Sequence, residues 1–225
     1  MGAPPTLPVK ERDAVWTVFV IDPLAAPLVA RLGSARSITP NRLTVLSAVA
    51  AVAAGAAFAA GPLWAGAALF QLSFLLDCMD GKLASARGRR DPAGALHDTI
   101  GDCVRLAAAA AGLAVGLDGE ADLAAALVTA YVGIRFSVIA VAEARPEPPA
   151  PPARIELPAR FGAFLRAAPR RSGLPGTTVD TEAVAFTLGP LLGLPVIGLA
   201  IAAAVDLLHL LVYVLAAVRA AMARS

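Results

Sequence analysis

The chain has 225 residues, of which 58% are hydrophobic and only 16% are charged, and its mean hydropathy is +0.71. Soluble domains average about 25% charged residues, so this composition excludes an ordinary soluble protein and indicates an integral membrane protein. The net charge of +2 says little by itself, and we expect no nucleic-acid partner.

Long apolar segments predict an all-α, polytopic membrane protein. Each segment is close to the roughly 20 residues that a helix needs to cross a bilayer. We expect an N-terminal arm with an interfacial helix over residues 1–38 and one membrane domain over residues 39–225. The six transmembrane helices are predicted at residues 42–60, 62–81, 93–116, 121–143, 181–194 with its flanks, and 196–218.

Lysine and arginine gather on one side of these predicted spans. All but two of the 19 lie in the N-terminal arm, the second-to-third and fourth-to-fifth connections and the C-terminal tail, and the other connections have none. The positive-inside rule therefore places both termini and the second-to-third connection in the cytoplasm of a multi-pass cell-membrane protein. The two exceptions, Arg105 and Arg135, lie inside predicted spans.

The N-terminal arm combines a proline-rich start with a short apolar stretch. Residues 1–10 are expected to be loose. Residues 11–36 are too short and too broken by proline for a span, which favours an interfacial helix on the cytoplasmic leaflet, with a solvated arm as the alternative. Thr39 is a candidate N-cap, with Pro40 at the first helical position. The first and third spans are rich in small residues, which predicts close helix packing.

Two pairs of aspartates stand where the second span ends and the third begins. Asp77 and Asp80 are three residues apart and Asp98 and Asp102 are four apart, so each pair lies on one helical face. Carboxylates are costly in a membrane, and four together repel one another. Divalent cations would remove this repulsion, and hard cations prefer carboxylate oxygens. The pattern therefore predicts a divalent-metal site.

Small residues share the helical faces of these carboxylates. Gly81 and Ala84 lie on the face of the first pair, and Gly94 stands one turn before Asp98. They leave room for a flat ligand against the backbone, although helix packing alone would also explain them.

The connection over residues 145–180 is rich in proline and arginine. It begins as a polyproline-like linker, and residues 154–171 could form a basic amphipathic helix on the membrane surface. Such a segment could gather phosphate or anionic lipid beside the aspartates, and a solvated loop is the alternative.

The last two spans carry two irregular features. Gly189, Pro190, Gly193 and Pro195 interrupt the fifth span. In the sixth, Asp206 stands one turn before His209, and an acid inside a membrane is a functional candidate. The simpler interpretation is that Asp206 pairs with Arg135 or Arg105 inside the bundle.

The motif resembles that of the CDP-alcohol phosphatidyltransferases. It reads Asp77-x-x-Asp80-Gly81-x-x-Ala84, followed by Gly94-x-x-x-Asp98-x-x-x-Asp102. Seven fixed positions would coincide by chance in roughly one chain per million. The resemblance covers about residues 39–220, and it implies a homodimer of six-helix chains. It also implies transfer of a substituted phosphate from a CDP-linked lipid to an alcohol, with release of CMP, in phospholipid biosynthesis.

The resemblance also implies roles for individual residues. Asp77, Asp80 and Asp98, with Asp102 nearby, would hold Mg²⁺ or Mn²⁺, with two ions expected. Gly81 and Ala84 would receive the cytidine, with Gly94 opposite. Asp102 would act as the base that takes the proton of the acceptor hydroxyl.

One position departs from the family pattern, which has arginine directly after the motif alanine. Here that residue is Ser85, so a contact to the donor phosphates is missing. Arg87 could replace it only if the helix ends there, and Arg105 is the other candidate, unless it serves only to orient Asp102. Lys82 is a weaker third choice.

Other functions stay open beside the leading hypothesis of an active enzyme. Ser85 motivates a weakened or silent family member that binds CDP-lipid without turnover. The broken fifth span and Asp206 motivate a small transporter, although paired inverted segments are lacking. The acceptor is expected to be a polar alcohol, and the basic 145–180 connection favours a phosphorylated one.

Overall fold

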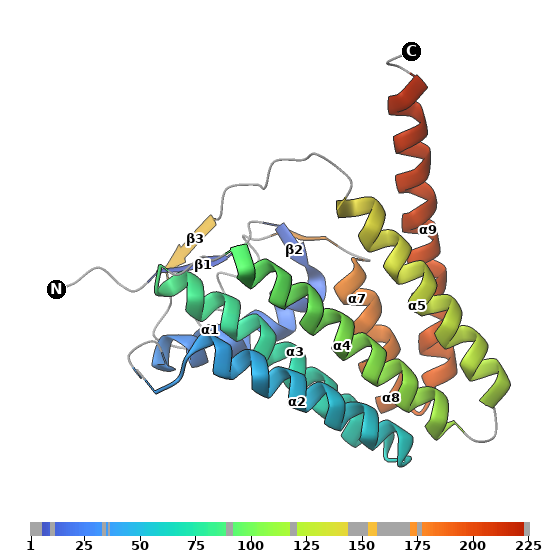
Figure 1. The fold of residues 1–225 in the computed structure, drawn as a ribbon, viewed down its shortest axis with the longest axis horizontal. Coiled ribbons are helices and arrows are strands. Elements are labelled where there is room, and N and C mark those ends of the chain that lie inside the picture. Colours follow the sequence, from blue (N-terminus) through green and yellow to red (C-terminus); the bar gives the residue numbers. More distant parts are fainter. Residues whose placement is uncertain are drawn as a thin grey trace.

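Five long helices form a bundle in which successive helices run back and forth (Figure 1). The structure, a computed structural model, describes residues 6–9, 12–32, 35, 37–88, 92–117, 121–143, 153–156, 172–174 and 177–222. The long helices are α2 (Pro40–Ala59), α3 (Leu63–Ala86), α4 (Pro92–Gly116), α5 (Ala121–Glu143) and α9 (Pro195–Met222). Their positions follow five of the six predicted helical segments.

Small residues bring α2 against α4, as the alanine and glycine content predicted. α2 packs on both α3 and α4. A Cβ atom added to Gly112 would collide with the backbone of Gly55, and one added to Gly55 would collide with the backbone of Ala108. Glycine is therefore required for this approach of α2 to α4. The start of α2 is also as predicted, because Oγ1 of Thr39 accepts a hydrogen bond from the Arg42 amide.

Aromatic residues fill the centre of the bundle. Phe58, Phe70, Tyr131 and Phe186 are buried in one apolar cluster. The Phe186 ring lies 5.2 Å from the Phe70 ring and 5.7 Å from the Tyr131 ring, measured between centroids. Such pairs stabilise packing beyond their buried area. They tie α3 and α5 to the segment that carries Phe186.

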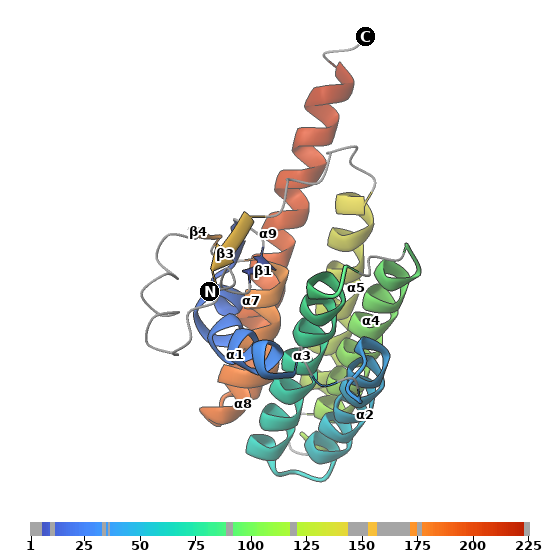
Figure 2. The ribbon, with the colours of Figure 1, turned by 90° about the vertical axis from the view of Figure 1, so that its left-hand side faces the viewer.

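The predicted fifth span is a chain of short helical pieces. It consists of α7 (Thr178–Ala183), the π-helical turn η4 (Val184–Leu188) and α8 (Gly189–Leu191). The helix stops after α8, where Gly193 has φ +70°, and α9 begins at Pro195. The interruption predicted from glycine and proline is thus present. α9 then pairs with α5, and its C-terminal part extends beyond the other helices (Figure 2).

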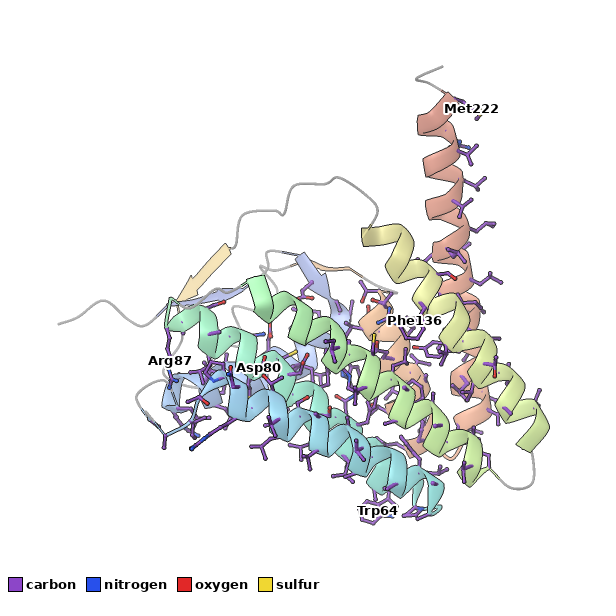
Figure 3. All side chains as sticks on the ribbon, viewed as in Figure 1. Trp64, Asp80, Arg87, Phe136 and Met222 are labelled. Atoms are coloured by element: carbon purple, nitrogen blue, oxygen red, sulfur yellow. The ribbon has the colours of Figure 1, made fainter. Side chains whose placement is uncertain are left out.

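Three of the described helices are long and apolar enough to cross a bilayer. They comprise Pro40–Ala59, Leu63–Ala86 and Pro195–Val212 of α9. Large apolar side chains on these helices are exposed, among them Val49, Trp64 and Leu208. Such surfaces suit contact with lipid chains. Figure 3 shows Trp64 at one end of α3 and Arg87 at the other.

Within the described part of the N-terminal arm, residues 6–9 form a strand, although residues 1–10 were expected to be loose. Two short strands, β1 (Thr6–Val9) and β2 (Arg12–Ala14), precede η1 (Thr17–Ile21) and α1 (Asp22–Leu32). β1 pairs antiparallel with β3 (Ala153–Glu156), and β2 pairs parallel with β4 (Ser172–Leu174).

Two expectations need correction here. The fold is mostly helical but not all-α, because extended segments of the arm and of the 145–180 connection satisfy each other's backbone groups. The basic helix predicted over 154–171 is wrong at its start, where residues 154–156 form part of a strand, and the rest of it lies outside the described residues.

α1 is held against α3 by a buried ion pair. Nζ of Lys82 lies 2.8 Å from Oδ1 of Asp22, whose side chain is 1% exposed. At the end of α3, the Arg87 guanidinium donates to the backbone carbonyls of Ile38, Ala35 and Leu32. These contacts fasten the arm to the end of α3 that carries the aspartate motif.

Candidate active site

The aspartate motif lies where α3 ends and α4 begins. Asp77 and Asp80 occupy the last turns of α3, while Asp98 and Asp102 occupy the first turns of α4. Because α3 and α4 follow each other in opposite directions, the two pairs lie at the same end of the bundle (Figure 1). The side chain of Asp98 and the surroundings of Gly94 are outside the described part of the structure.

Asp80 is held from α2. It is buried, and its Oδ2 accepts a hydrogen bond from Oγ1 of Thr44 at 2.5 Å. Thr44 lies one turn after Pro40, so the N-cap that starts α2 also sets the position of this hydroxyl. Sequence reasoning missed Thr44, because nothing in its local pattern shows that it faces α3.

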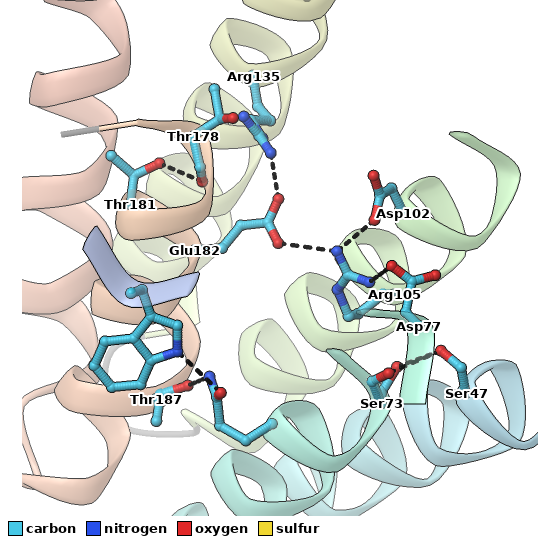
Figure 4. A network of polar contacts seen from close by, with 12 residues as sticks. Ser47, Ser73, Asp77, Asp102, Arg105, Arg135, Thr178, Thr181, Glu182 and Thr187 are labelled. Atoms are coloured by element: carbon cyan, nitrogen blue, oxygen red, sulfur yellow. Dashed lines mark hydrogen bonds and ion pairs between the residues drawn. The ribbon is translucent and has the colours of Figure 1, made fainter. Parts of the chain in front are cut away.

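Asp77 and Asp102 flank a single buried guanidinium. Nη1 of Arg105 lies 3.6 Å from Oδ2 of Asp77, and Nη2 of Arg105 lies 2.5 Å from Oδ1 of Asp102 (Figure 4). The α4 backbone lies close by, since a Cβ atom at Gly101 would be 3.6 Å from Oδ1 of Asp77. One carboxylate from α3 and one from α4 therefore lie beside the same guanidinium.

The three described aspartates differ in their access to solvent. The Asp102 side chain is 47% exposed and that of Asp77 is 16% exposed, whereas Asp80 is buried. Asp102 is thus the most accessible of these three to a polar molecule that arrives from water.

Arg105 is enclosed by aromatic rings and by a further acid. Its side chain is 2% exposed, and its guanidinium carbon lies 4.9 Å from the Phe74 ring centroid and 5.9 Å from the Phe70 centroid. Its Nη2 also lies 3.4 Å from Oε2 of Glu182 on α7. Stacking and ion pairs together fix the place of this cation.

Glu182 corrects our expectation for Asp206. We expected Asp206 to pair with Arg135 or Arg105, but the carboxylate that contacts both arginines is that of Glu182. Oδ1 of Asp206 instead accepts a hydrogen bond from Oγ1 of Thr181 at 3.0 Å and lies 3.9 Å from Nδ1 of His209. Glu182 was missed, although its place in an apolar segment was the signal that could have found it.

The predicted ligand-binding positions have different surroundings. Gly81 is exposed, and a Cβ atom there would meet no atom within 4 Å. Ala84 and Ser85 are half-buried on the last turn of α3. Arg87 was expected to approach a ligand only if the helix ended beside it, and α3 does end at Ala86. The Arg87 guanidinium, however, donates to three backbone carbonyls.

The donor chemistry of the site fits a hard divalent cation. Asp77, Asp80 and Asp102 offer carboxylate oxygens, the ligands that Mg²⁺ and Mn²⁺ prefer. Among the described side chains no group of three acids, cysteines or histidines converges on one point as a formed metal cage. Asp98, the fourth predicted ligand, falls outside that set.

Comparisons with known proteins agree on one family. The family model of the CDP-alcohol phosphatidyltransferases matches residues 37–169. The chain is 34% identical over 166 residues to the bifunctional IPC transferase and DIPP synthase of Rubrobacter xylanophilus. The aligned region covers 70% of this chain and 32% of the relative. The chain therefore spans about a third of the length of that relative.

The fold is similar to that of solved membrane-enzyme structures. Phosphatidylinositol phosphate synthase of Mycobacterium tuberculosis in its apo form is 20% identical, with a TM-score of 0.57 over 84% of this chain and 93% of that chain. With CDP-DAG bound, the same synthase is 20% identical, with a TM-score of 0.54 over 85% of this chain and 92% of that chain. In complex with manganese and citrate, the synthase is 19% identical, with a TM-score of 0.55 over 85% of this chain and 87% of that chain.

Proposed function

This chain belongs to the CDP-alcohol phosphatidyltransferase family, and from that premise we propose that it transfers a substituted phosphate from a CDP-linked lipid to an alcohol. The reaction breaks the phosphoanhydride bond of the donor, forms a phosphate ester with the acceptor oxygen and releases CMP. The observation that supports it best is the meeting of Asp77 on α3 and Asp102 on α4 at one guanidinium, within the family motif.

The aspartates would hold the divalent cations of the reaction. We assign this role to Asp77, Asp80, Asp98 and Asp102, with Mg²⁺ or Mn²⁺ as the ions and two ions expected. Bound divalent cations supply neutralisation of the negative charge on the donor diphosphate. The hydroxyl of Thr44 orients Asp80 for this role, and Arg105 orients Asp102.

Asp102 would accept the proton of the acceptor hydroxyl. A general base needs to be within hydrogen-bond reach of that proton, and Asp102 has the most exposed side chain of the three described aspartates. The ion pair with Arg105 holds Oδ1 of Asp102 at 2.5 Å and limits rotation of the carboxylate. The proton leaves the acceptor oxygen as that oxygen attacks the donor phosphorus.

The nucleotide of the donor would lie against the small residues of the motif. The open space around Gly81 suits the cytidine, with Ala84 beside it on α3 and Gly94 on α4. The M. tuberculosis synthase with CDP-DAG bound supports a CDP-linked lipid as the donor.

Ser85 supports a second candidate function. A chain that lacks the family arginine at this position could bind CDP-lipid with little or no turnover. Arg105 is a candidate replacement among the described residues, yet three carboxylates already contact it. Arg87 lies closer along the chain and is engaged with the connection between α1 and α2.

For the acceptor we propose a polar alcohol that carries a phosphate. The basic 145–180 connection and the name of the M. tuberculosis phosphatidylinositol phosphate synthase support this choice. For the whole protein we propose six spans after an N-terminal interfacial arm over residues 1–38, with both termini and the active site in the cytoplasm. A homodimer in the bilayer is the proposed assembly.

One assay tests the proposed reaction. Membranes that contain the chain are incubated with CDP-diacylglycerol, Mn²⁺ and a panel of alcohols, and CMP and the lipid product are identified by mass spectrometry. CMP release that depends on one acceptor supports the transferase. Donor binding without CMP release for every acceptor would support the silent family member.

A further inference from the structure

Glu182 lies between two buried arginines that come from different helices. Its Oε2 is 3.4 Å from Nη2 of Arg105 on α4, and its Oε1 accepts from Nη2 of Arg135 on α5 (Figure 4). The three side chains are 2%, 6% and 5% exposed for Arg105, Arg135 and Glu182. Glu182 is thus a buried acid that links α4, α5 and α7.

Three carboxylates lie around Arg105, and two of them, those of Asp102 and Glu182, contact the same nitrogen, Nη2. Asp77 and Asp102 approach it from one side, and Glu182 approaches it on the other (Figure 4). If Glu182 lost its charge, Asp77 and Asp102 would be the only acids among the described side chains that contact the buried Arg105 cation. With one competing carboxylate removed, Arg105 would interact more strongly with those two aspartates.

Arg135 also depends on Glu182. Among the described residues, Nε and Nη1 of Arg135 are buried without a hydrogen-bond partner, while Nη2 donates to Glu182. The two arginines therefore hold Glu182 in place, where Glu182 competes with Asp102 for Nη2 of Arg105, at 3.4 Å against 2.5 Å. This arrangement leaves the aspartate oxygens more available to cations.

We propose that Glu182 is a positioning residue of the reaction, which acts through Arg105 to keep Asp77 and Asp102 available for divalent cations. The inference rests on the proposed function, because it assumes that these aspartates bind the ions. Partners of this kind, one contact removed from a metal ligand, typically change metal affinity about 10–100-fold when they are replaced.

The test measures Mn²⁺ binding rather than turnover. The purified full-length chain in detergent is titrated with Mn²⁺, and free ion is followed by electron paramagnetic resonance. Glu182→Gln keeps the shape of the side chain and removes its charge. We expect it to weaken Mn²⁺ binding about 10-fold or more, with thermal unfolding recorded to show that the variant is folded.

Two matched variants separate the role of Arg105 from a general change in charge. Asp206→Asn removes a buried negative charge that contacts Thr181, the neighbour of Glu182, so it should leave Mn²⁺ binding unchanged. Glu182→Gln combined with Arg135→Gln preserves the net charge of the network but still leaves Arg105 without Glu182. This double variant should bind Mn²⁺ as weakly as Glu182→Gln.

A third variant serves if Glu182→Gln does not fold. Glu182→Asp keeps the charge on a shorter side chain, so it should bind Mn²⁺ less tightly than the wild type and more tightly than the double variant. Wild-type affinity in Glu182→Gln, equal weakening by Asp206→Asn or wild-type affinity in the double variant would each overturn the inference. Absence of Mn²⁺ binding in the wild-type chain would instead overturn the proposed metal site, and the inference with it.

Discussion

Nη2 of Arg105 lies 2.5 Å from Oδ1 of Asp102, one helical turn earlier on α4. The guanidinium is buried in the bundle, while the Asp102 carboxylate is about half exposed at its surface. The core of the protein thus determines how the proposed base is oriented toward the ligands. A charge-assisted hydrogen bond of this kind is stronger than one between neutral groups.

Asp102→Asn should abolish most of the turnover without unfolding the chain. Loss of a general base costs about 10²–10⁴-fold in rate, and the amide also removes one proposed metal ligand. CMP release per mole of protein measures the change. Thermal unfolding is the control, and a variant that keeps the wild-type rate would contradict the assigned role.

Thr44→Val should weaken metal-dependent activity, because it removes the hydroxyl that donates to Oδ2 of Asp80 while the shape of the side chain is nearly kept. We expect the Mn²⁺ concentration for half-maximal CMP release to rise about 10-fold or more. Thr129→Val is the matched control, since the Thr129 hydroxyl contacts only the Ala125 carbonyl of its own helix among the described residues. An equal shift in both variants would exclude a specific role for Thr44.

Ser85→Arg should lower the KM for the CDP-linked donor. A hydrogen bond to a charged group is worth about 1.5–3 kcal/mol, which corresponds to roughly a 10-fold or larger change in affinity. CMP release at a series of donor concentrations measures it. If the wild-type chain releases no CMP and Ser85→Arg does, Ser85 is the cause of the inactivity. A KM that does not fall would show that another cation already binds the donor phosphates.

The helices and the motif could be predicted because both depend on local patterns. Apolar segments of about 20 residues predict helices, and spacings of three and four place Asp77 with Asp80 on one face. The break in the fifth segment also followed from its glycines and prolines. These features involve residues close together in the chain, so no knowledge of the tertiary fold was needed.

The contacts that complete the site could not be predicted in this way. Glu182 is 77 residues from Arg105 and 47 residues from Arg135 in the chain, and local spacing cannot show which buried acid faces which arginine. Asp206 was a candidate because it is an acid inside an apolar segment, and pairing with Arg135 or Arg105 was expected, yet its carboxylate contacts Thr181. The pairing of β1 with β3 likewise joins segments from opposite parts of the chain.

Gly112→Ala should destabilise the protein, because the added Cβ atom would collide with the backbone of Gly55 where α2 meets α4. Overpacking of this kind costs about 1–3 kcal/mol. Gly133→Ala is the matched control, since a Cβ atom there would meet no atom within 4 Å, and it should leave stability unchanged or slightly higher. Thermal unfolding in detergent compares the two, and equal effects would contradict the close packing of α2 on α4.

One measurement tests directly whether the aspartates of α3 and α4 bind the cations. Crystals of the chain are soaked in Mn²⁺, and an anomalous difference map locates the ion. We predict density between the end of α3 and the start of α4, within coordination distance of Asp77, Asp80, Asp98 and Asp102. An ion elsewhere, or no ion there at saturating Mn²⁺, would contradict the account.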